Sequence, residues 1–203
     1  MEINFWGYII LSFSFSKINF IMQWISTIVL IFTLSIMYRE FRRNIKNRKQ
    51  DLYAKLELTS MELFKLEIEY PELTKIYYKE AEKNLPASVN FDVLDDEYKR
   101  LYGYIASLLN LFEIHYVLRK TNEINPEIFA SWMPWLFDVL ASPYFRWAWQ
   151  DLKKHYIRGL RRFIDNLIRI IERGGDEKKL YQEASKEFEN DVIIKNWWRE
   201  NSG

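Results

Sequence analysis

The sequence predicts an all-α protein in which an N-terminal transmembrane helix continues into an antiparallel cytoplasmic helical bundle. Two observations predict this fold class. Residues 18–38 form an uncharged apolar run, and the rest of the chain shows helical periodicity without sustained period-two alternation. Removing an anchor of about 40 residues from the 203 leaves roughly 160, which is enough for one domain with a hydrophobic core.

The apolar run at residues 18–38 reads INFIMQWISTIVLIFTLSIMY and contains no charge, no Gly and no Pro. A helix needs about 20 such residues to cross the hydrocarbon core of a bilayer. A cleaved signal peptide is the competing interpretation. It is disfavoured because the run is too long and no small-residue cleavage site follows it. We therefore expect a transmembrane helix at this position.

A basic juxtamembrane collar at residues 39–50 predicts the orientation of that helix. Its cations are Arg39, Arg42, Arg43, Lys46, Arg48 and Lys49. Because Lys and Arg are retained on the cytoplasmic side of a membrane span, we expect residues 51–203 to form a cytoplasmic helical bundle. The protein is thus expected in the inner membrane, crossing it once.

The segment before the span, residues 1–17, is apolar but too short to cross a bilayer alone. It carries Trp6 and Tyr8, whose side chains favour the headgroup region. We interpret it as an interfacial segment or as an outer extension of the same helix. A two-helix hairpin that turns near Lys17 is the alternative, although no turn residue marks a bend there.

Polar side chains gather on one face of the predicted membrane helix. Steps of alternately four and three residues connect Ser16, Asn19, Gln23, Ser26 and Thr33. Such a polar face is unfavourable against lipid and favourable against another helix or water. Beyond the membrane the same stepping becomes an apolar seam, formed by Phe41, Ile45 and Leu52, which predicts a homo-oligomer. The alternative is that Ser and Thr are common in membrane helices and that the apolar part packs on its own domain.

Helix signals divide the rest of the chain. Pro71 follows the helix that leaves the membrane, and Asn125-Pro126 and Ser142-Pro143 are cap-then-proline pairs that start new helices. Gly174-Gly175 ends a helix. The expected helices cover residues 50–70, 71–84, 92–120 (capped by Asp92), 126–141 (with a kink or a new start at Pro134), 142–173 and 176–189.

Composition excludes several kinds of site. The net charge is +1, so global charge predicts no nucleic-acid partner. There is no Cys, which excludes disulfides and thiolate metal sites and is typical of a cytoplasmic domain. The two histidines, His115 and His155, are too few for a histidine-rich zinc site, and no cofactor is expected.

Arginine and histidine provide the weak catalytic candidates: Arg146, His155, His115 and Arg119. In a metal-independent ribonuclease, His acts as acid and base while Arg stabilises phosphate charge. That is the logic of the HEPN family, whose signature places an Arg four to six residues before a His. Here Arg146 and His155 are too far apart for the signature, and His115 precedes Arg119 in reversed order. Each is more commonly a structural or surface residue.

An aromatic cluster surrounds Arg146. Its members are Trp132, Trp135, Tyr144, Phe145, Trp147 and Trp149. One interpretation is a pocket for a ring-shaped or phosphate-bearing ligand. The other is an aromatic core, in which Arg146 pairs with an acid such as Glu113 or Asp138.

Basic residues also line one side of the helix expected at 142–173. They are Lys154, Arg158, Arg161, Arg162 and Arg169, interrupted by Asp165. Such a face could attract RNA, a nucleotide or anionic lipid. A solvated helix surface is the alternative, because acidic residues are about as numerous as basic ones overall.

The order of these features carries a resemblance. A membrane span and basic collar precede Tyr70-Pro71-Glu72-Leu73 and Phe112-Glu113, followed by Trp132, Trp135, Pro143, Phe145, Arg146 and Trp149. This arrangement resembles small bacterial single-span membrane proteins with a helical cytoplasmic domain of unknown function. More distantly, it is similar to the membrane accessory proteins of type VI-B CRISPR systems. That likeness implies a HEPN-like helical domain and assembly into pores that support antiviral defence.

Three functions are therefore open. The first is a membrane-anchored protein that homo-oligomerises at the inner membrane, including as a pore in defence. The second is a membrane-tethered ribonuclease or nucleotide-responsive enzyme. The third is a membrane scaffold that recruits a cytosolic protein partner.

Overall fold

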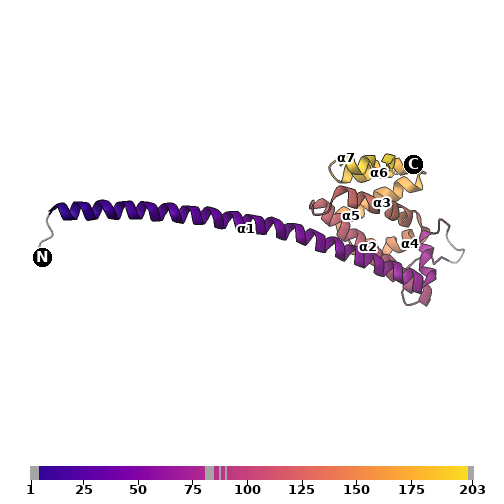
Figure 1. Ribbon diagram of the computed structural model, residues 1–203. Coiled ribbons are helices and arrows are strands. Elements are labelled where there is room, and N and C mark those ends of the chain that lie inside the picture. The colour runs from indigo at the N-terminus through magenta and orange to yellow at the C-terminus, as the bar shows by residue number, and fades with distance from the viewer. Residues whose placement is uncertain (1–4, 81–84, 87, 90, 201–203) are drawn as a thin grey trace. The chain divides into compact units, whose positions relative to one another are not determined.

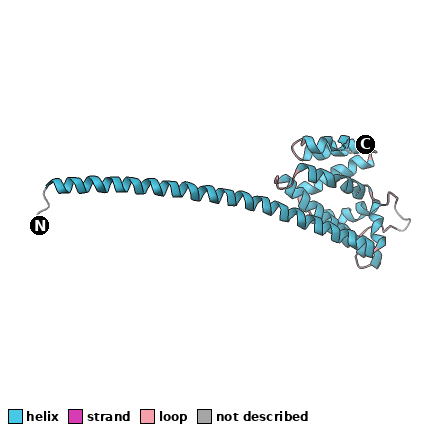
Figure 2. Cartoon of the chain, in the orientation of Figure 1, coloured by secondary structure: helices cyan, strands magenta, loops and turns pink. Residues whose placement is uncertain are grey.

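The computed structural model describes residues 5–80, 85–86, 88–89 and 91–200. Within its helices, the side chains of residues 5–21, 25, 46 and 200 lie outside this description. The described residues are all-helical and include no strand, which confirms the all-α class (Figure 2). The chain divides into two compact units, Met1–Leu52 (the N-terminal unit) and Tyr53–Gly203 (the C-terminal unit).

Helix α1 spans Phe5–Glu69. No Gly or Pro occurs between residues 8 and 70, and the helix ends directly before Tyr70-Pro71, as the sequence predicts. Within it, the stretch Met22–Glu69 is long and apolar enough to cross a membrane, by length and composition. Residues 1–4 of the expected interfacial segment lie outside the described residues.

The C-terminal unit is built from short helices around α3 (Pro126–Ala141). Helix α3 contacts η1, α2, α4, α5 and α7, and Figure 1 shows the neighbouring pair α6 and α7 side by side. Its residues Phe129, Leu136 and Leu140 are almost fully buried. The other elements are η1 (Pro71–Tyr77), α2 (Asp96–Lys120), α4 (Pro143–Leu152), η2 (Lys153–His155), α5 (Arg158–Glu172), α6 (Glu177–Glu187) and α7 (Val192–Glu200).

Side-chain caps fix three of the predicted helix starts. Asn125 accepts a hydrogen bond from Glu127 N (2.9 Å), Ser142 from Tyr144 N (3.3 Å) and Asp176 from Lys179 N (2.9 Å). Helix α2 starts later than expected, because its cap is Asp95 rather than Asp92. Each cap satisfies a backbone N–H that the first turn leaves without an intrahelical partner.

The predicted helix at 142–173 is wrong. The structure breaks it into α4, η2 and α5, although no Gly or Pro occurs at the break. The Tyr156 hydroxyl donates towards Ala106 O and Asn110 Oδ1, both at 3.2 Å. Ile157 N donates to Glu113 Oε1 at 3.0 Å. The Ile157 contact satisfies a backbone N–H that a continuous helix would have used internally, and the Tyr156 hydroxyl holds the break against α2.

Three further expectations differ from the structure. The helix expected at 71–84 is a 3₁₀ helix that ends at Tyr77. Helix α3 continues through Pro134, so no new helix starts there, which was one of the two outcomes expected. Helix α7 follows Asp191, where the sequence analysis expected no helix; Asp191 Oδ1 accepts from Ile193 N at 2.9 Å and so caps its start.

The last turns of α1 pack within the C-terminal unit. Leu56 and Leu63 are 6% and 5% exposed. Glu67 Oε1 accepts hydrogen bonds from the hydroxyls of Tyr77 (2.6 Å) and Tyr104. Burial, reinforced by the Glu67 hydrogen bond, raises the pKa of Tyr77 to about 12, so the phenol stays protonated and keeps donating.

Candidate functional site

The apolar part of α1 exposes its side chains in every direction. Residues 28–32 are consecutive, apolar and between 50% and 67% exposed. Successive helical residues are rotated by about 100°, so these side chains cover the whole circumference. Among the predicted polar-face residues, Gln23, Ser26 and Thr33 are exposed, whereas the side chains of Ser16 and Asn19 lie outside the description.

The apolar seam divides into two parts. Phe41 is 63% exposed and Ile45 is 42% exposed, while Leu52 is half-buried. Further along, Leu56 and Leu63 continue the same stepping but are buried in the C-terminal unit. The chain's own domain therefore buries Leu56 and Leu63 of this stepping, whereas Leu66 stays 37% exposed.

Arg146 and His155 lie in different elements. Arg146 Nη1 donates to Ala141 O at 3.0 Å, a carbonyl at the end of α3 where a cation is favoured. Its expected partner Glu113 instead accepts from Ile157 N. His155 is exposed in η2. The structure gives neither residue a shared site.

The aromatic cluster near Arg146 is mostly core. Tyr144, Phe145, Trp147 and Trp149 are at most 5% exposed. The rings of Phe145 and Trp149 stack at 6.0 Å, and Trp149 Nε1 donates to Asp165 Oδ1 at 2.8 Å. The buried indole N–H thus has the partner that burial requires.

The predicted basic face is divided among different contacts. Lys154 pairs with Asp151 at 2.6 Å, and Arg162 reaches Glu187 at 3.5 Å. Arg161 is half-buried, and among the described residues of this face only Arg158 and Arg169 are exposed without an ion pair. Two separated arginines make a weaker anion-binding surface than the five residues suggested.

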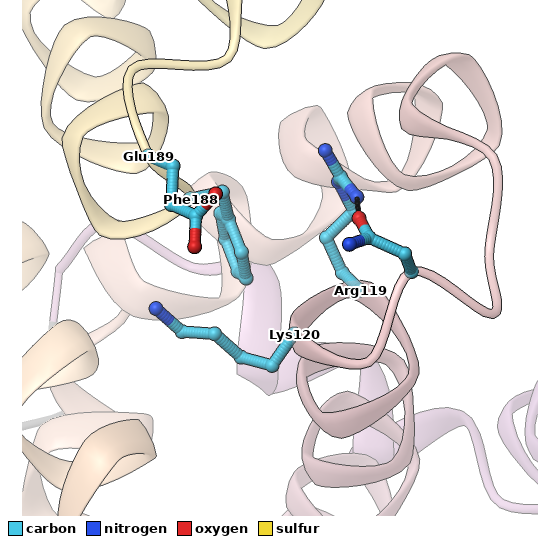
Figure 3. A pocket seen from close by; sticks show the side chains of 5 residues that line it. Arg119, Lys120, Phe188 and Glu189 are labelled. Atoms are coloured by element: carbon cyan, nitrogen blue, oxygen red, sulfur yellow. Dashed lines mark hydrogen bonds between the residues drawn. The ribbon is translucent and has the colours of Figure 1, made fainter.

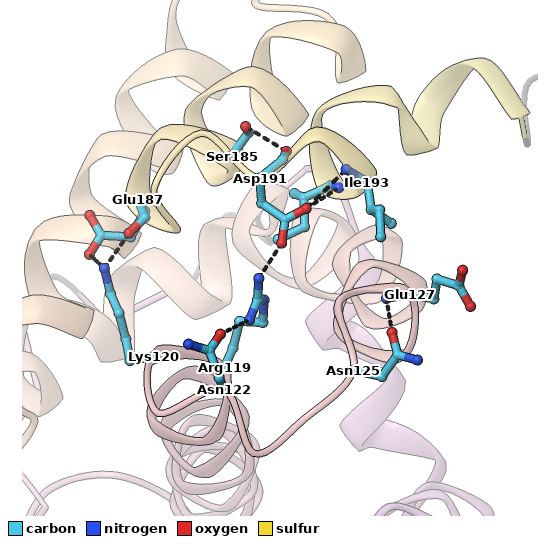
Figure 4. Close-up of polar contacts among 10 residues, drawn as sticks. Arg119, Lys120, Asn122, Asn125, Glu127, Ser185, Glu187, Asp191 and Ile193 are labelled. Atoms are coloured by element: carbon cyan, nitrogen blue, oxygen red, sulfur yellow. Dashed lines mark hydrogen bonds and ion pairs between the residues drawn. The ribbon is translucent and has the colours of Figure 1, made fainter.

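Arg119 belongs to a set of contacts, here called the latch, that joins the C-terminal end of α2 to the α6–α7 connection (Figure 4). Its guanidinium pairs with Asp191, and Nη1 donates to Asn122 Oδ1 at 2.8 Å. The Arg119 and Asp191 side chains are only 10% and 7% exposed. Beside them Lys120 pairs with Glu187 at 2.9 Å. A buried ion pair of this kind is sensitive to the loss of either partner.

Glu187 and the adjoining cavity complete the latch. Burial raises the pKa of Glu187, but hydrogen bonds from Tyr116 (2.7 Å) and Lys120 outweigh it, so the net pKa is lowered. Arg119, Lys120, Asn122, Phe188 and Glu189 line a cavity of about 30 Å³ (Figure 3). That volume holds about one water molecule, so the latch is a structural contact and has no room for a ligand.

His115 lies in a different environment, a cavity of about 200 Å³ within the C-terminal unit. Three helices line it: α1 contributes Tyr53, Leu56 and Glu57, α2 contributes His115, and α3 contributes Ile128, Ser131 and Trp132. The His115 ring lies against the Trp132 ring with the centroids 3.8 Å apart and the ring planes tilted by 36°. This cavity is the candidate site for a small ligand.

His115 is neutral and half-satisfied. Its side chain is almost fully buried, with the residue 2% exposed, and Nδ1 lies 2.9 Å from Leu111 O. Burial lowers the pKa of His115 to about 4, although the backbone hydrogen bond opposes the shift. Within the described chain, Nε2 is buried and has no hydrogen-bond partner.

The described residues contain no group of three or more His, Asp or Glu side chains that could hold a metal ion. Comparison with known proteins adds no assignment, because no family model, curated protein or solved structure matches the chain.

Sequence reasoning singled out His115 and Trp132 but not the residues that complete their cavity. Glu57 and Ser131 look like ordinary exposed helix residues, and Asp191, the partner of Arg119, is 72 residues away. No local pattern marks such partners, since the fold alone brings them together.

Proposed function

We propose that this chain is a single-pass protein of the inner membrane whose C-terminal unit is cytoplasmic and which homo-oligomerises through α1. The observation that carries the proposal is the all-round exposure of apolar side chains at residues 28–32. Packing against a single protein partner would cover one face of such a helix, whereas lipid covers all of it.

The basic collar supports the orientation. Arg39, Arg42 and Arg43 are exposed directly after the apolar run, and Arg42 Nε donates to the Tyr38 hydroxyl at 3.1 Å. A tyrosine beside arginines at the end of a span is typical of the membrane interface. The orientation places the latch and the His115 cavity in the cytoplasm.

Self-association is supported by two sets of side chains on α1. Gln23, Ser26 and Thr33 are polar groups exposed within the apolar run, and Phe41 and Ile45 are apolar groups exposed beyond it. Thr33 Oγ1 donates to Val29 O at 2.9 Å within its own helix. A second copy of the helix would supply polar contacts to Gln23 and Ser26 and apolar contacts to Phe41 and Ile45. A pore lined by the polar face is the form of this assembly that the resemblance to CRISPR accessory proteins favours.

Cysteine labelling tests the orientation, because the chain has no cysteine of its own. Asn4→Cys should react with a membrane-impermeant thiol reagent in intact cells, and Gln150→Cys should react only after lysis. Labelling of Gln150→Cys from outside the cell would overturn the cytoplasmic placement.

Paired substitutions test the assembly. Asn19→Leu with Gln23→Leu should abolish ion leakage from vesicles while preserving particle mass if the polar face is a wet pore. If the face is a dry contact, the particle mass itself should fall, since each interhelical hydrogen bond contributes about 0.6–2 kcal/mol. Phe41→Ser with Ile45→Ser should lower the particle mass in both cases.

The matched control is Thr27→Leu with Ser35→Leu, because both residues belong to the apolar run but lie outside its polar face. The control should behave as wild type in leakage and in particle mass. Wild-type behaviour of all three double variants would refute the oligomer.

A further inference from the structure

The His115 cavity has a chemical character that the membrane proposal does not use. We propose that it binds a small organic cation: an ammonium or guanidinium group with N–H donors, attached to a short apolar body. The proposal rests on which lining groups accept hydrogen bonds, on the charge of the lining and on its aromatic surface.

The tautomer of His115 determines what its free nitrogen can do. Nδ1 lies 2.9 Å from Leu111 O, and a carbonyl oxygen can only accept, so the proton is on Nδ1. In a neutral imidazole the other nitrogen then carries a lone pair. Nε2 is therefore a buried acceptor without a partner in the described chain, and a ligand donor reaches it when the His115 or Trp132 ring shifts.

Two more lining groups accept hydrogen bonds. The Ser131 hydroxyl donates its only hydrogen to Ile128 O at 2.8 Å, which leaves its oxygen lone pairs for a donor. Glu57 adds a carboxylate, and the lining contains no Lys or Arg. The cavity thus has a net negative charge and three hydrogen-bond acceptors. A cationic group with N–H donors therefore binds there more favourably than an anion does.

Aromatic and aliphatic groups complete the fit. Trp132 is half-buried and offers an indole ring, and a cation near such a ring gains about 0.5–2 kcal/mol. Leu56 and Ile128 provide apolar surface for the body of the ligand. About 200 Å³ corresponds to roughly six water volumes, a size that suits a small amine rather than a nucleotide.

A purely structural role for His115 does not explain why its Nε2 is buried without a hydrogen-bond partner in the described chain. A buried nitrogen without a partner is destabilising, and buried polar groups in native proteins nearly always have one. Phenylalanine would fill the same space against Trp132 without that penalty. A histidine at this position is favourable when a donor occupies the cavity.

Direct titration tests the proposal on the full-length chain in detergent. The probes are benzylamine and agmatine, with benzyl alcohol as a neutral analogue of benzylamine. With ¹⁵N-labelled histidine and His155→Gln as background, the only histidine signals come from His115. Both cations should shift the Nε2 resonance saturably, whereas benzyl alcohol should bind at least tenfold more weakly. Equal binding of benzyl alcohol, or no Nε2 shift with either cation, would overturn the proposal.

Variants of the lining separate this site from non-specific binding. Glu57→Gln should weaken benzylamine binding about tenfold or more, in the range expected when a charged hydrogen-bond partner is lost. Glu62→Gln removes an exposed carboxylate from the same helix outside the cavity and should bind like wild type. His115→Phe should keep the fold and abolish saturable binding. Unchanged binding in Glu57→Gln and His115→Phe would place the cation elsewhere.

The same cationic group also occurs on arginine side chains of other proteins. A blocked Gly-Arg-Gly peptide distinguishes this source from a free small molecule. Tighter binding of agmatine than of the peptide supports a small-molecule ligand, and the reverse order would overturn that assignment.

Discussion

The apolar run of α1 and helix α3 are made of similar residues, yet their exposure is opposite. Leu30 in the run is 59% exposed, whereas Leu140 in α3 is fully buried. Helix α3 hides its apolar side chains among five neighbouring elements, and the run in the N-terminal unit has no comparable cover. The difference is the one expected if the apolar run meets lipid, as proposed, while α3 meets the protein interior.

The largest effect is expected when charged residues are introduced into the apolar run of α1. Ile28→Arg with Ile31→Arg should move the protein from the membrane fraction to the soluble or aggregated fraction, because each arginine at a span centre costs about 2.5–3.5 kcal/mol. Carbonate extraction of membranes measures the effect. Ile28→Leu with Ile31→Leu is the control and should stay in the membrane. Retention of the arginine variant would show that residues 28–31 are not the anchor.

The C-terminal unit also buries charge, but only as a pair. Arg119→Met leaves Asp191 buried without its partner and should destabilise the unit by about 3–5 kcal/mol. Denaturant unfolding followed by near-UV circular dichroism gives the free energy. Arg158→Met removes an exposed arginine and should change stability by less than about 0.5 kcal/mol. Similar values for the two variants would contradict the structural role of the latch.

The same leucine truncation can be made in both regions. Leu140→Ala should reduce the unfolding free energy of the C-terminal unit by about 2–5 kcal/mol, because it leaves a cavity in the core. Leu30→Ala should leave that free energy unchanged, since its side chain contributes to no core in the described chain. A large loss in Leu30→Ala would mean that the run supports the fold of the C-terminal unit.

The smallest expected effect is a pH dependence. In the folded protein the pKa of His115 is about 4, below the usual 6.5, because burial disfavours the imidazolium. Between these values the unfolded chain binds a proton that the folded chain does not. Stability should therefore fall as pH drops from about 6.5 to 4, by at most about 3 kcal/mol. His115→Phe should lose this contribution, and His155→Gln, at an exposed position, should keep it.

Local signals predicted much of the fold. Asn125, Ser142 and Asp176 were identified as helix starts because a cap acts on residues two or three positions away. The break between α4 and α5 was missed because its causes are distant: Tyr156 contacts Ala106, and Ile157 contacts Glu113. A single sequence shows which residues are neighbours along the chain. It does not show which distant residues the fold brings into contact.

The candidate site was less predictable for the same reason. His115 and Trp132 attracted attention by residue type, and both line the cavity. Glu57 and Ser131 stand in ordinary helix sequences. They line the same cavity as His115 only because α1, α2 and α3 pack together. Sequence spacing placed Arg146 and His155 too far apart on one long helix to meet the HEPN signature, and the structure replaces that helix with three elements.

The latch also has a consequence for biosynthesis. Arg119 and Asp191 are separated by 72 residues, so translation at about 5–20 residues per second leaves Arg119 without its partner for about 4 to 14 seconds. The apolar run has by then emerged and can already engage the membrane. With the proposed membrane anchor, the nascent chain is tethered before the Arg119–Asp191 pair can form. Because the buried pair needs both partners, the C-terminal unit reaches its full stability only after Asp191 has been synthesised.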